Sequence, residues 1–340
     1  MTESLSKSIN IVKAALLVGV VMIHCNPLQY YSPDAGSVLE IYSSLAAVLS
    51  FCVPGFFIIS GYLFFANIDK FTWTVYGAKM KSRLFSLLIP YLIWCTLYGI
   101  VRYFKAKYLG FEGDGIVVDG EFSIIGFIKG YWNTGAGYPM GFALWFIRNL
   151  IVFQLLTQIL HWIGKYWVLA VPILILPLFD IELYGIEYFL WGSLLAIHKV
   201  ELGDFIKRYS VLIAILFLAL IPVSFYTIPR LLPLLRYISI FVMISVAMEC
   251  QKDFPRFSGF IQSNSNAFFF IYAIHGMYCT VIDKFYFNVF GCADGWIPAS
   301  VACFLASLLT NLVLSTAIFL LMRALSPRLL NILCGGRYLS

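Results

Sequence analysis

Apolar residues occur in long blocks along this chain, and short polar stretches separate the blocks. A helix needs about 20 mostly apolar residues to cross the roughly 30 Å hydrocarbon core of a bilayer. The pattern therefore predicts an all-α fold, a polytopic membrane bundle of about ten transmembrane helices. The predicted helices lie at residues 9–30, 38–66, 84–104, 142–162, 166–180, 183–198, 209–228, 234–250, 266–287 and 297–322.

The fifth and sixth blocks are short, and Pro172 and Pro177 interrupt the fifth. Asp180 and Glu182 lie between the two blocks, where a polar turn is expected. We therefore interpret residues 166–198 as a tight helical hairpin. With an even number of spans, both chain ends lie on the same side of the membrane.

The distribution of Lys and Arg indicates which side this is, because cytoplasmic loops are enriched in these residues. If both ends are cytoplasmic, 14 Lys and Arg residues lie in cytoplasmic loops and 7 lie in outer loops. This bias favours an N-in, C-in topology. The longest loop, at about residues 105–141, then faces outward, and its stretch Phe122–Trp132 is apolar enough to lie on the membrane surface or dip into it.

Composition excludes several other classes of protein. Of the 340 residues, 61% are hydrophobic and only 12% are charged, whereas a soluble chain carries about 25% charged residues. The basic residues behind the net charge of +6 lie between apolar blocks, so they do not indicate nucleic-acid binding. The eight cysteines show no paired spacing, which predicts neither a disulfide framework nor a metal site. No internal repeat is visible, and we interpret residues 1–340 as a single integral membrane domain.

Ionisable residues inside membrane spans are costly, so they are candidates for function. The first span contains Lys13 and His24, which are eleven positions apart. They lie within about 20° of one helix face and ~16 Å apart along the helix axis. Lys13 could equally be an interfacial lysine whose amino group reaches water, and His24 could be hydrogen-bonded at the outer interface. The spacing alone does not separate these interpretations.

Two further ionisable residues lie within predicted spans. Arg148 lies several residues inside the fourth span, where an arginine must pair or face a wet cavity. His275 lies in the middle of the ninth span, where a helix–helix hydrogen bond is an alternative to a catalytic role.

A basic cluster precedes the third span and consists of Lys79, Lys81 and Arg83. Positive charge and free N–H groups at a helix start can hold a phosphate group. The same cluster could serve as an ordinary cytoplasmic anchor of the span.

Taken together, these segments resemble the acyltransferase 3 family of bacterial integral membrane O-acyltransferases. The first helix of that family typically carries Arg or Lys, ten residues and then His, as Lys13 and His24 do here. Further stretches that are similar to landmarks of the family lie at residues 53–64, 84–91, 144–148 and 271–275. Lys replaces the commoner Arg at position 13, and the usual Asp before it is absent. No hydrolase-like domain follows the last span, so the membrane domain is expected to complete transfer alone or with a separate partner.

The resemblance implies an enzyme of the bacterial inner membrane that transfers an acyl group, usually acetyl, from cytoplasmic acyl-CoA. The acceptor would be a hydroxyl of a cell-surface or lipid-linked saccharide. Acetyl-CoA would be a co-substrate, and no bound cofactor is implied. Other proteins of polysaccharide biosynthesis would be its partners.

The resemblance also suggests roles for the candidate residues. His24 would act as general base on the acceptor hydroxyl, because the near-neutral pKa of histidine suits that task; a covalent acyl-histidine remains an alternative. Arg148 or His275 would stabilise the thioester oxyanion. The donor phosphates would be held by Lys13, Lys79, Lys81 and Arg83.

Two other classes compete with this interpretation. A transporter or flippase for a lipid-linked glycan would use the same intramembrane charges without acyl-CoA, but it would favour internal repeats or broken helices. A structural or sensor protein would not need ionisable residues such as Lys13 and His24 on one face of a membrane span.

Overall fold

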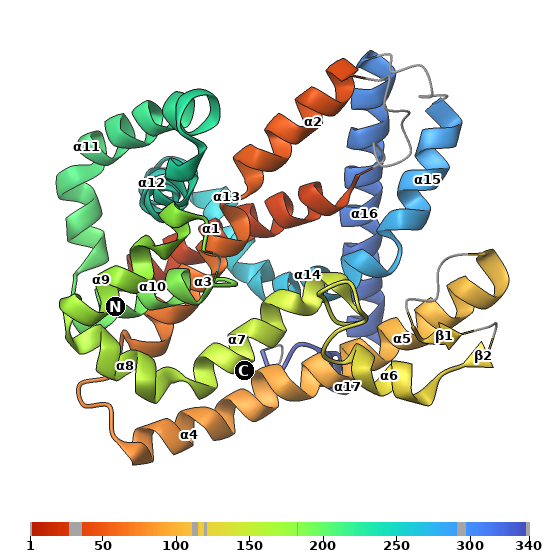
Figure 1. Cartoon of the computed structure of the whole chain (residues 1–340), viewed down its shortest axis with the longest axis horizontal. Helices are drawn as coiled ribbons and strands as arrows, with labels where there is room; N and C mark the ends of the chain where they lie inside the picture. Colours follow the sequence, from red (N-terminus) through yellow and green to blue (C-terminus); the bar gives the residue numbers. More distant parts are fainter. Residues whose placement is uncertain are drawn as a thin grey trace. The chain divides into compact units, whose positions relative to one another are not determined.

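The computed structural model describes residues 2–26, 36–110, 115–118, 121–181, 183–290 and 297–337. Most of these residues are helical, and a single two-stranded sheet occurs among them (Figure 1). Six of the described helical segments are long and apolar enough to cross a membrane: Glu3–His24, Glu40–Phe65, Trp73–Leu109, Leu202–Phe225, Pro229–Asp253 and Ile297–Leu325. The all-α membrane class predicted from the sequence is therefore confirmed.

Two bent helix pairs raise the count to as many as eight. Phe142–Leu155 meets Thr157–Lys165 at 67°, and Pro255–Met277 meets Cys279–Phe290 at 61°. The predicted fifth and sixth spans form shorter apolar helices, Trp167–Phe179 and Ile186–Ile197. The structure therefore supports six to eight spans by length and composition, and the predicted count of about ten is not confirmed.

The described residues form two compact units, and each unit is built from three separate stretches of the chain. Unit 1 comprises Met1–Gly19, Val48–Met80 and Val152–Ser265. Unit 2 comprises Val20–Ala47, Lys81–Ile151 and Asn266–Ser340. Helix α1 (Glu3–His24) belongs to both, because its last residues fall in unit 2.

Unit 1 is built around a close contact between α3 and α10. Gly61 of α3 and Gly192 of α10 make this contact possible, since a Cβ on Gly192 would lie 1.9 Å from the Ile58 carbonyl oxygen. Small residues at helix interfaces let backbones approach in this way in membranes. Beyond α1, unit 1 contains α3 (Cys52–Phe65), α4 (Trp73–Arg83) as far as Met80, α8 (Thr157–Lys165), α9 (Trp167–Ile175), α10 (Ile186–Ile197), α11 (Leu202–Pro222), α12 (Leu232–Asp253) and α13 (Pro255–Asn264).

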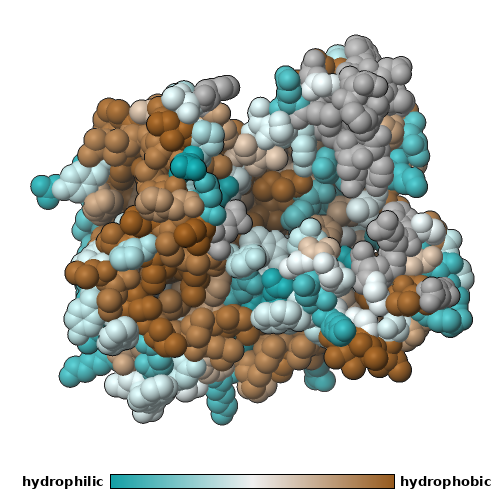
Figure 2. Space-filling model, viewed as in Figure 1, coloured by the Kyte–Doolittle hydropathy of each residue, from teal (hydrophilic) through white to brown (hydrophobic). Residues whose placement is uncertain are grey.

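The outer side of α11 is apolar, as expected for a surface that faces lipid. Val211, Ile215 and Leu218 are exposed, and Figure 2 shows hydrophobic residues gathered over this part of unit 1. Helices α9 and α10 contact each other and are joined through Asp180, as the predicted hairpin requires. Glu182 lies outside the described residues.

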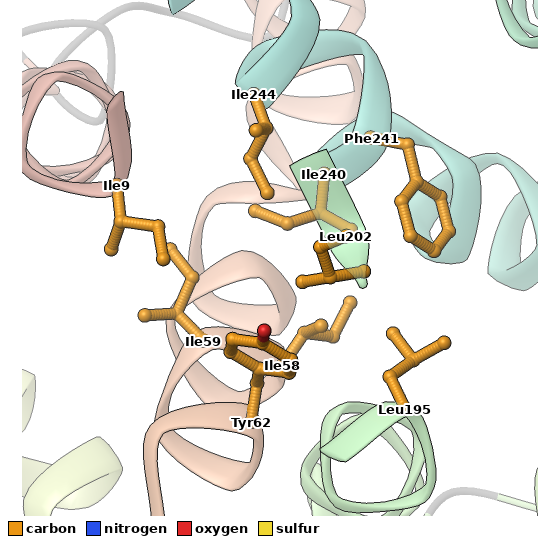
Figure 3. A pocket seen from close by; sticks show the side chains of 9 residues that line it. All are labelled: Ile9, Ile58, Ile59, Tyr62, Leu195, Leu202, Ile240, Phe241 and Ile244. Carbon is orange, nitrogen blue, oxygen red and sulfur yellow. The ribbon is translucent and has the colours of Figure 1, made fainter. Parts of the chain in front are cut away.

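A small pocket inside unit 1 is lined by apolar side chains from α1, α3, α10, α11 and α12 (Figure 3). Apart from the Tyr62 hydroxyl, its lining is hydrocarbon. Because its lining offers no charged group and no histidine, the pocket is not a candidate active site.

Unit 2 packs α5 against α14 and α17, and α14 against α16. Trp94 of α5 lies 5.4 Å from the Phe270 ring and donates a hydrogen bond to the Leu333 carbonyl (3.1 Å). Unit 2 contains α2 (Gly36–Leu49) as far as Ala47, the end of α4 from Lys81, α5 (Ile89–Leu109), α6 (Ile124–Gly130), α7 (Trp145–Leu155) as far as Ile151, α14 (Phe268–Ile274), α15 (Cys279–Phe290), α16 (Ile297–Leu325) and α17 (Pro327–Leu333), with short turns η2 (Leu84–Leu88), η3 (Phe142–Leu144) and η8 (His275–Met277).

The described residues of the predicted outer loop include helices and a short strand pair. Helix α5 extends to Leu109, beyond the predicted limit at residue 104, and ends where Gly110 adopts a left-handed conformation (φ 69°). An antiparallel pair, β1 (Val117–Val118) with β2 (Glu121–Phe122), and α6 follow. Ile124, Ile125 and Ile128 of α6 are exposed, so α6 presents the apolar surface that the sequence predicted for this stretch.

Candidate functional site

Lys13 and His24 lie on one continuous helix, and His24 is the last residue of α1. Both side chains are half-buried. The Lys13 amino group donates to Asn10 Oδ1 (3.5 Å), and Asn10 in turn donates to Gln262 Oε1 of α13 (2.8 Å). The end of α1 that carries Lys13 is thus held within unit 1 by polar contacts.

His24 meets a second histidine in unit 2. The rings of His24 and His275 are stacked, with centroids 5.4 Å apart and planes inclined by 29°. The Phe142 ring meets His24 edge-on, with centroids 4.7 Å apart. The sequence analysis singled out each histidine separately, and the structure brings the two together.

His275 lies at the break between α14 and η8, and its side chain is fully buried. Its Nδ1 atom lies 2.7 Å from the Tyr272 carbonyl oxygen. A carbonyl oxygen only accepts hydrogen bonds, so Nδ1 carries the proton, and Nε2 of the neutral ring is an acceptor. Nε2 is buried and has no hydrogen-bond partner in the described structure. Such an unsatisfied group is unusual in a native interior and is consistent with a role in binding or catalysis.

Helices α5 and α16 hold the turn around His275. The Tyr98 hydroxyl donates to the Ala273 carbonyl (2.9 Å), and Asn311 Nδ2 donates to the His275 carbonyl (3.4 Å). A Cβ on Gly276 would lie 2.7 Å from the Tyr98 oxygen and 3.1 Å from the Phe142 ring. Gly276 therefore allows these aromatic residues to pack directly against the turn.

Asp283 is a buried polar residue of this site that the sequence analysis did not single out. Its Oδ2 atom accepts a hydrogen bond from the backbone N–H of Asn26 (3.0 Å), two residues after His24. The side chain of Asp283 is fully buried, and Oδ1 has no partner within the described part of the chain. An acid inside the apolar block 266–287 was the signal that could have identified it. Asp283 fixes the chain just beyond His24.

Arg148 lies on α7 and binds the loop that follows α6. Its guanidinium donates to the carbonyl oxygens of Trp132 and Gly137 and lies 5.0 Å from the Trp132 ring centre. Through these contacts Arg148 stabilises the conformation of this loop. Its role at the thioester oxyanion stays a prediction.

The three basic residues before the third span lie on α4 and have different surroundings. Lys79 donates to the Phe64 carbonyl at the end of α3 (3.1 Å) and lies over the Phe64 ring. Lys81 is exposed, and Arg83 is half-buried at the junction with η2. Helix α4, η2 and α5 form one long helical segment, Trp73–Leu109.

Within the described ranges, no three His, Cys, Asp or Glu side chains are arranged to hold a metal ion. The seven cysteines that the structure describes are free thiols, and six of them are buried.

Comparisons with known proteins agree with the resemblance seen in the sequence. The model of the acyltransferase 3 family, described as an acyltransferase domain, matches residues 6–320. The succinoglycan biosynthesis protein ExoH of Rhizobium meliloti (strain 1021) is 27% identical over 174 residues, which are 47% of this chain and 43% of ExoH. The aligned part therefore spans less than half of that relative, and no solved structure matches significantly. With six to eight helices in its described part that are long and apolar enough to cross a membrane, the chain is a multi-pass membrane protein that belongs to the acyltransferase 3 family.

Proposed function

We propose that the protein is an O-acetyltransferase of the bacterial inner membrane. It moves an acetyl group from cytoplasmic acetyl-CoA to a hydroxyl of a cell-surface or lipid-linked polysaccharide. The family match supports the acyl transfer, and the similarity to a protein of succinoglycan biosynthesis supports a polysaccharide acceptor. The observation that carries the proposal is the stacked pair of His24 and His275 in unit 2.

In the proposed reaction, His24 removes the proton from the acceptor hydroxyl. The oxygen forms a bond to the carbonyl carbon of the thioester, and the carbon–sulfur bond breaks. The protonated His24 then returns the proton to the departing thiolate of CoA. The reaction yields an ester and free CoA, so atoms and charges balance.

His275 supports this reaction best as a hydrogen-bond acceptor. Because its Nδ1 proton is engaged by the Tyr272 carbonyl, Nε2 of the neutral ring can accept from the acceptor hydroxyl or from protonated His24. Two stacked imidazoles repel each other when both are positively charged. A neutral His275 therefore allows His24 to take up the proton of the acceptor hydroxyl and become positively charged. Oxyanion stabilisation by His275 would require its protonated form.

The donor is proposed to reach His24 along α1. Lys13 and His24 lie ~16 Å apart along this helix, which is comparable to the length of an extended pantetheine arm. In this proposal the nucleotide phosphates lie near Lys13 and the basic residues of α4, and the thioester lies near His24.

Transfer of labelled acetyl groups tests the proposed function. Membranes that contain the chain are expected to move label from acetyl-CoA to purified surface polysaccharide, and membranes that lack it are not. A parallel assay with a longer acyl-CoA tests donor length. Polysaccharide that changes in amount at the surface without carrying label would instead support a flippase.

The donor role of Lys13 gives a second expected result. Lys13→Ala should raise the KM for acetyl-CoA about tenfold or more, because a hydrogen bond to a charged group contributes about 1.5–3 kcal/mol. Lys13→Arg should retain donor affinity. Lys7→Ala is the matched control, since Lys7 lies on the same helix and pairs with Glu3 at the surface. An unchanged KM in Lys13→Ala would remove the phosphate role.

A further inference from the structure

The last helix of the chain returns to the beginning of α5. Helix α17 lies beyond residues 6–320, which the family model matches. The hydrogen bond from Trp94 to the Leu333 carbonyl holds α17 against α5. Two consecutive glycines follow, Gly335 and Gly336, and both adopt left-handed conformations (φ 66° and 79°). They turn the chain so that the next residue, Arg337, folds back toward Ser86.

Gly335 brings Arg337 close to η2, the π-helical turn that begins one residue after Arg83. A Cβ on Gly335 would lie 2.3 Å from the Ser86 carbonyl oxygen and 2.9 Å from Arg337 Nη1. The Arg337 guanidinium also donates to the Cys334 carbonyl (2.8 Å) and lies 4.5 Å from the Phe269 ring centre. These contacts hold the side chain in one place beside the turn.

Arg83 and Arg337 are close enough to affect each other electrostatically. Burial and, to a smaller extent, the charge of Arg83 lower the pKa of Arg337 to about 10. Even so, both guanidinium groups stay charged at neutral pH. Two like charges in a partly buried place are unfavourable unless an opposite charge offsets them.

No opposite charge is supplied by the described part of the chain. Neither arginine forms an ion pair with a described carboxylate. Arg83 Nε and Ser86 Oγ are buried and have no hydrogen-bond partner among the described residues. The site therefore combines two guanidinium groups, one of them with an unsatisfied Nε–H, and one unsatisfied hydroxyl, which is the donor set that an oxyanion requires.

We propose that Arg83, Arg337 and the Ser86 hydroxyl together bind a phosphate or diphosphate group. Guanidinium forks match phosphate oxygens in a bidentate manner, and the Ser86 hydroxyl adds a third donor. One source of this group is the diphosphate of acyl-CoA, and this assignment rests on the proposed function. The other source is the phosphate of an anionic lipid headgroup. In both cases Arg337, outside the family match, completes the site.

Binding to the purified full chain in neutral detergent, without added phospholipid, tests the proposal. Isothermal titration with pyrophosphate and with CoA is expected to show binding that Arg337→Gln weakens about tenfold or more, since charge-assisted hydrogen bonds are lost. Arg337→Lys should restore part of the affinity. Pantetheine, which has no phosphate, should bind Arg337→Gln and the wild type equally.

Arg328→Gln is the matched control, because Arg328 lies on α17 but is exposed to solvent. It should bind both probes as the wild type does. The melting temperature of unliganded Arg337→Gln should not fall, because the substitution removes a like charge next to Arg83. This measurement separates a lost binding site from a misfolded protein.

The lipid source is tested by thermal unfolding with added phosphatidylglycerol or phosphatidylcholine. Stabilisation by phosphatidylglycerol that depends on Arg337, without CoA binding, supports the site and assigns it to a lipid. The chain could also bind pyrophosphate through Arg337 and yet transfer no label from acetyl-CoA. That result would support the phosphate site and contradict the proposed function. Unchanged affinity of Arg337→Gln for pyrophosphate, CoA and phosphatidylglycerol would overturn the inference.

Discussion

His24→Ala is expected to lower acetyl transfer by about 10²–10⁴-fold, which is the range that a positioned general base contributes. The loss should appear in kcat, because the substitution removes the proton acceptor rather than a donor-binding group. His24→Gln should be equally inactive, since an amide can hydrogen-bond but cannot take the proton. The measurement is label transfer from acetyl-CoA to polysaccharide at saturating donor.

The matched control is His161→Phe. His161 is a half-buried histidine of unit 1 whose ring stacks on Phe65, and a phenyl ring keeps that contact. His161→Phe should therefore retain activity. Near-normal transfer by a folded His24→Ala protein would show that the general-base assignment is wrong. Label retained on wild-type protein in the absence of acceptor, and lost in His24→Ala, would instead favour the acyl-histidine route.

Gly192→Leu is expected to disrupt unit 1. The Cβ of any larger residue at position 192 would lie 1.9 Å from the Ile58 carbonyl oxygen and 2.9 Å from the Tyr62 backbone nitrogen. Because both obstacles are backbone atoms, α3 and α10 have to separate, and overpacking of this kind costs about 1–3 kcal/mol or more. The expected result is a lower melting temperature in detergent and a smaller monodisperse fraction. Gly192→Ala should show the same effect to a smaller extent.

Gly203→Ala provides the comparison, since a Cβ at that position of α11 would meet no atom within 4 Å. It should leave stability unchanged or raise it slightly, because alanine favours helix more than glycine does. If Gly192→Leu unfolds at the same temperature as Gly203→Ala, the close approach of α3 and α10 does not contribute to stability.

The sequence predicted the positions of the long and the short apolar helices, but it did not decide whether the short ones count as membrane spans. The length of an apolar block is a local property, so blocks such as 209–228 and 297–322 could be assigned directly to helices that cross a bilayer. In the stretch 166–198, by contrast, the described helices α9 and α10 are shorter than a membrane requires.

For the candidate site, the sequence supplied the chemical groups but not their arrangement. The separation of Lys13 and His24 along α1 follows from helix geometry alone, and the structure has both on one continuous helix. Arg148 was singled out because arginine is costly in a span. Its contacts with the carbonyl oxygens of Trp132 and Gly137 depend on how the loop after α6 folds back onto α7.

By itself, then, the sequence determined the all-α membrane class, the helices with long apolar blocks and the family resemblance. These depend on residue type and on spacing within one helix. The tertiary structure alone decided that His24 stacks on His275, that Asp283 binds the backbone after His24, and that Arg337 lies close to Ser86 of η2. The partners in each pair are far apart in the chain, and only the packing of their helices brings their side chains together.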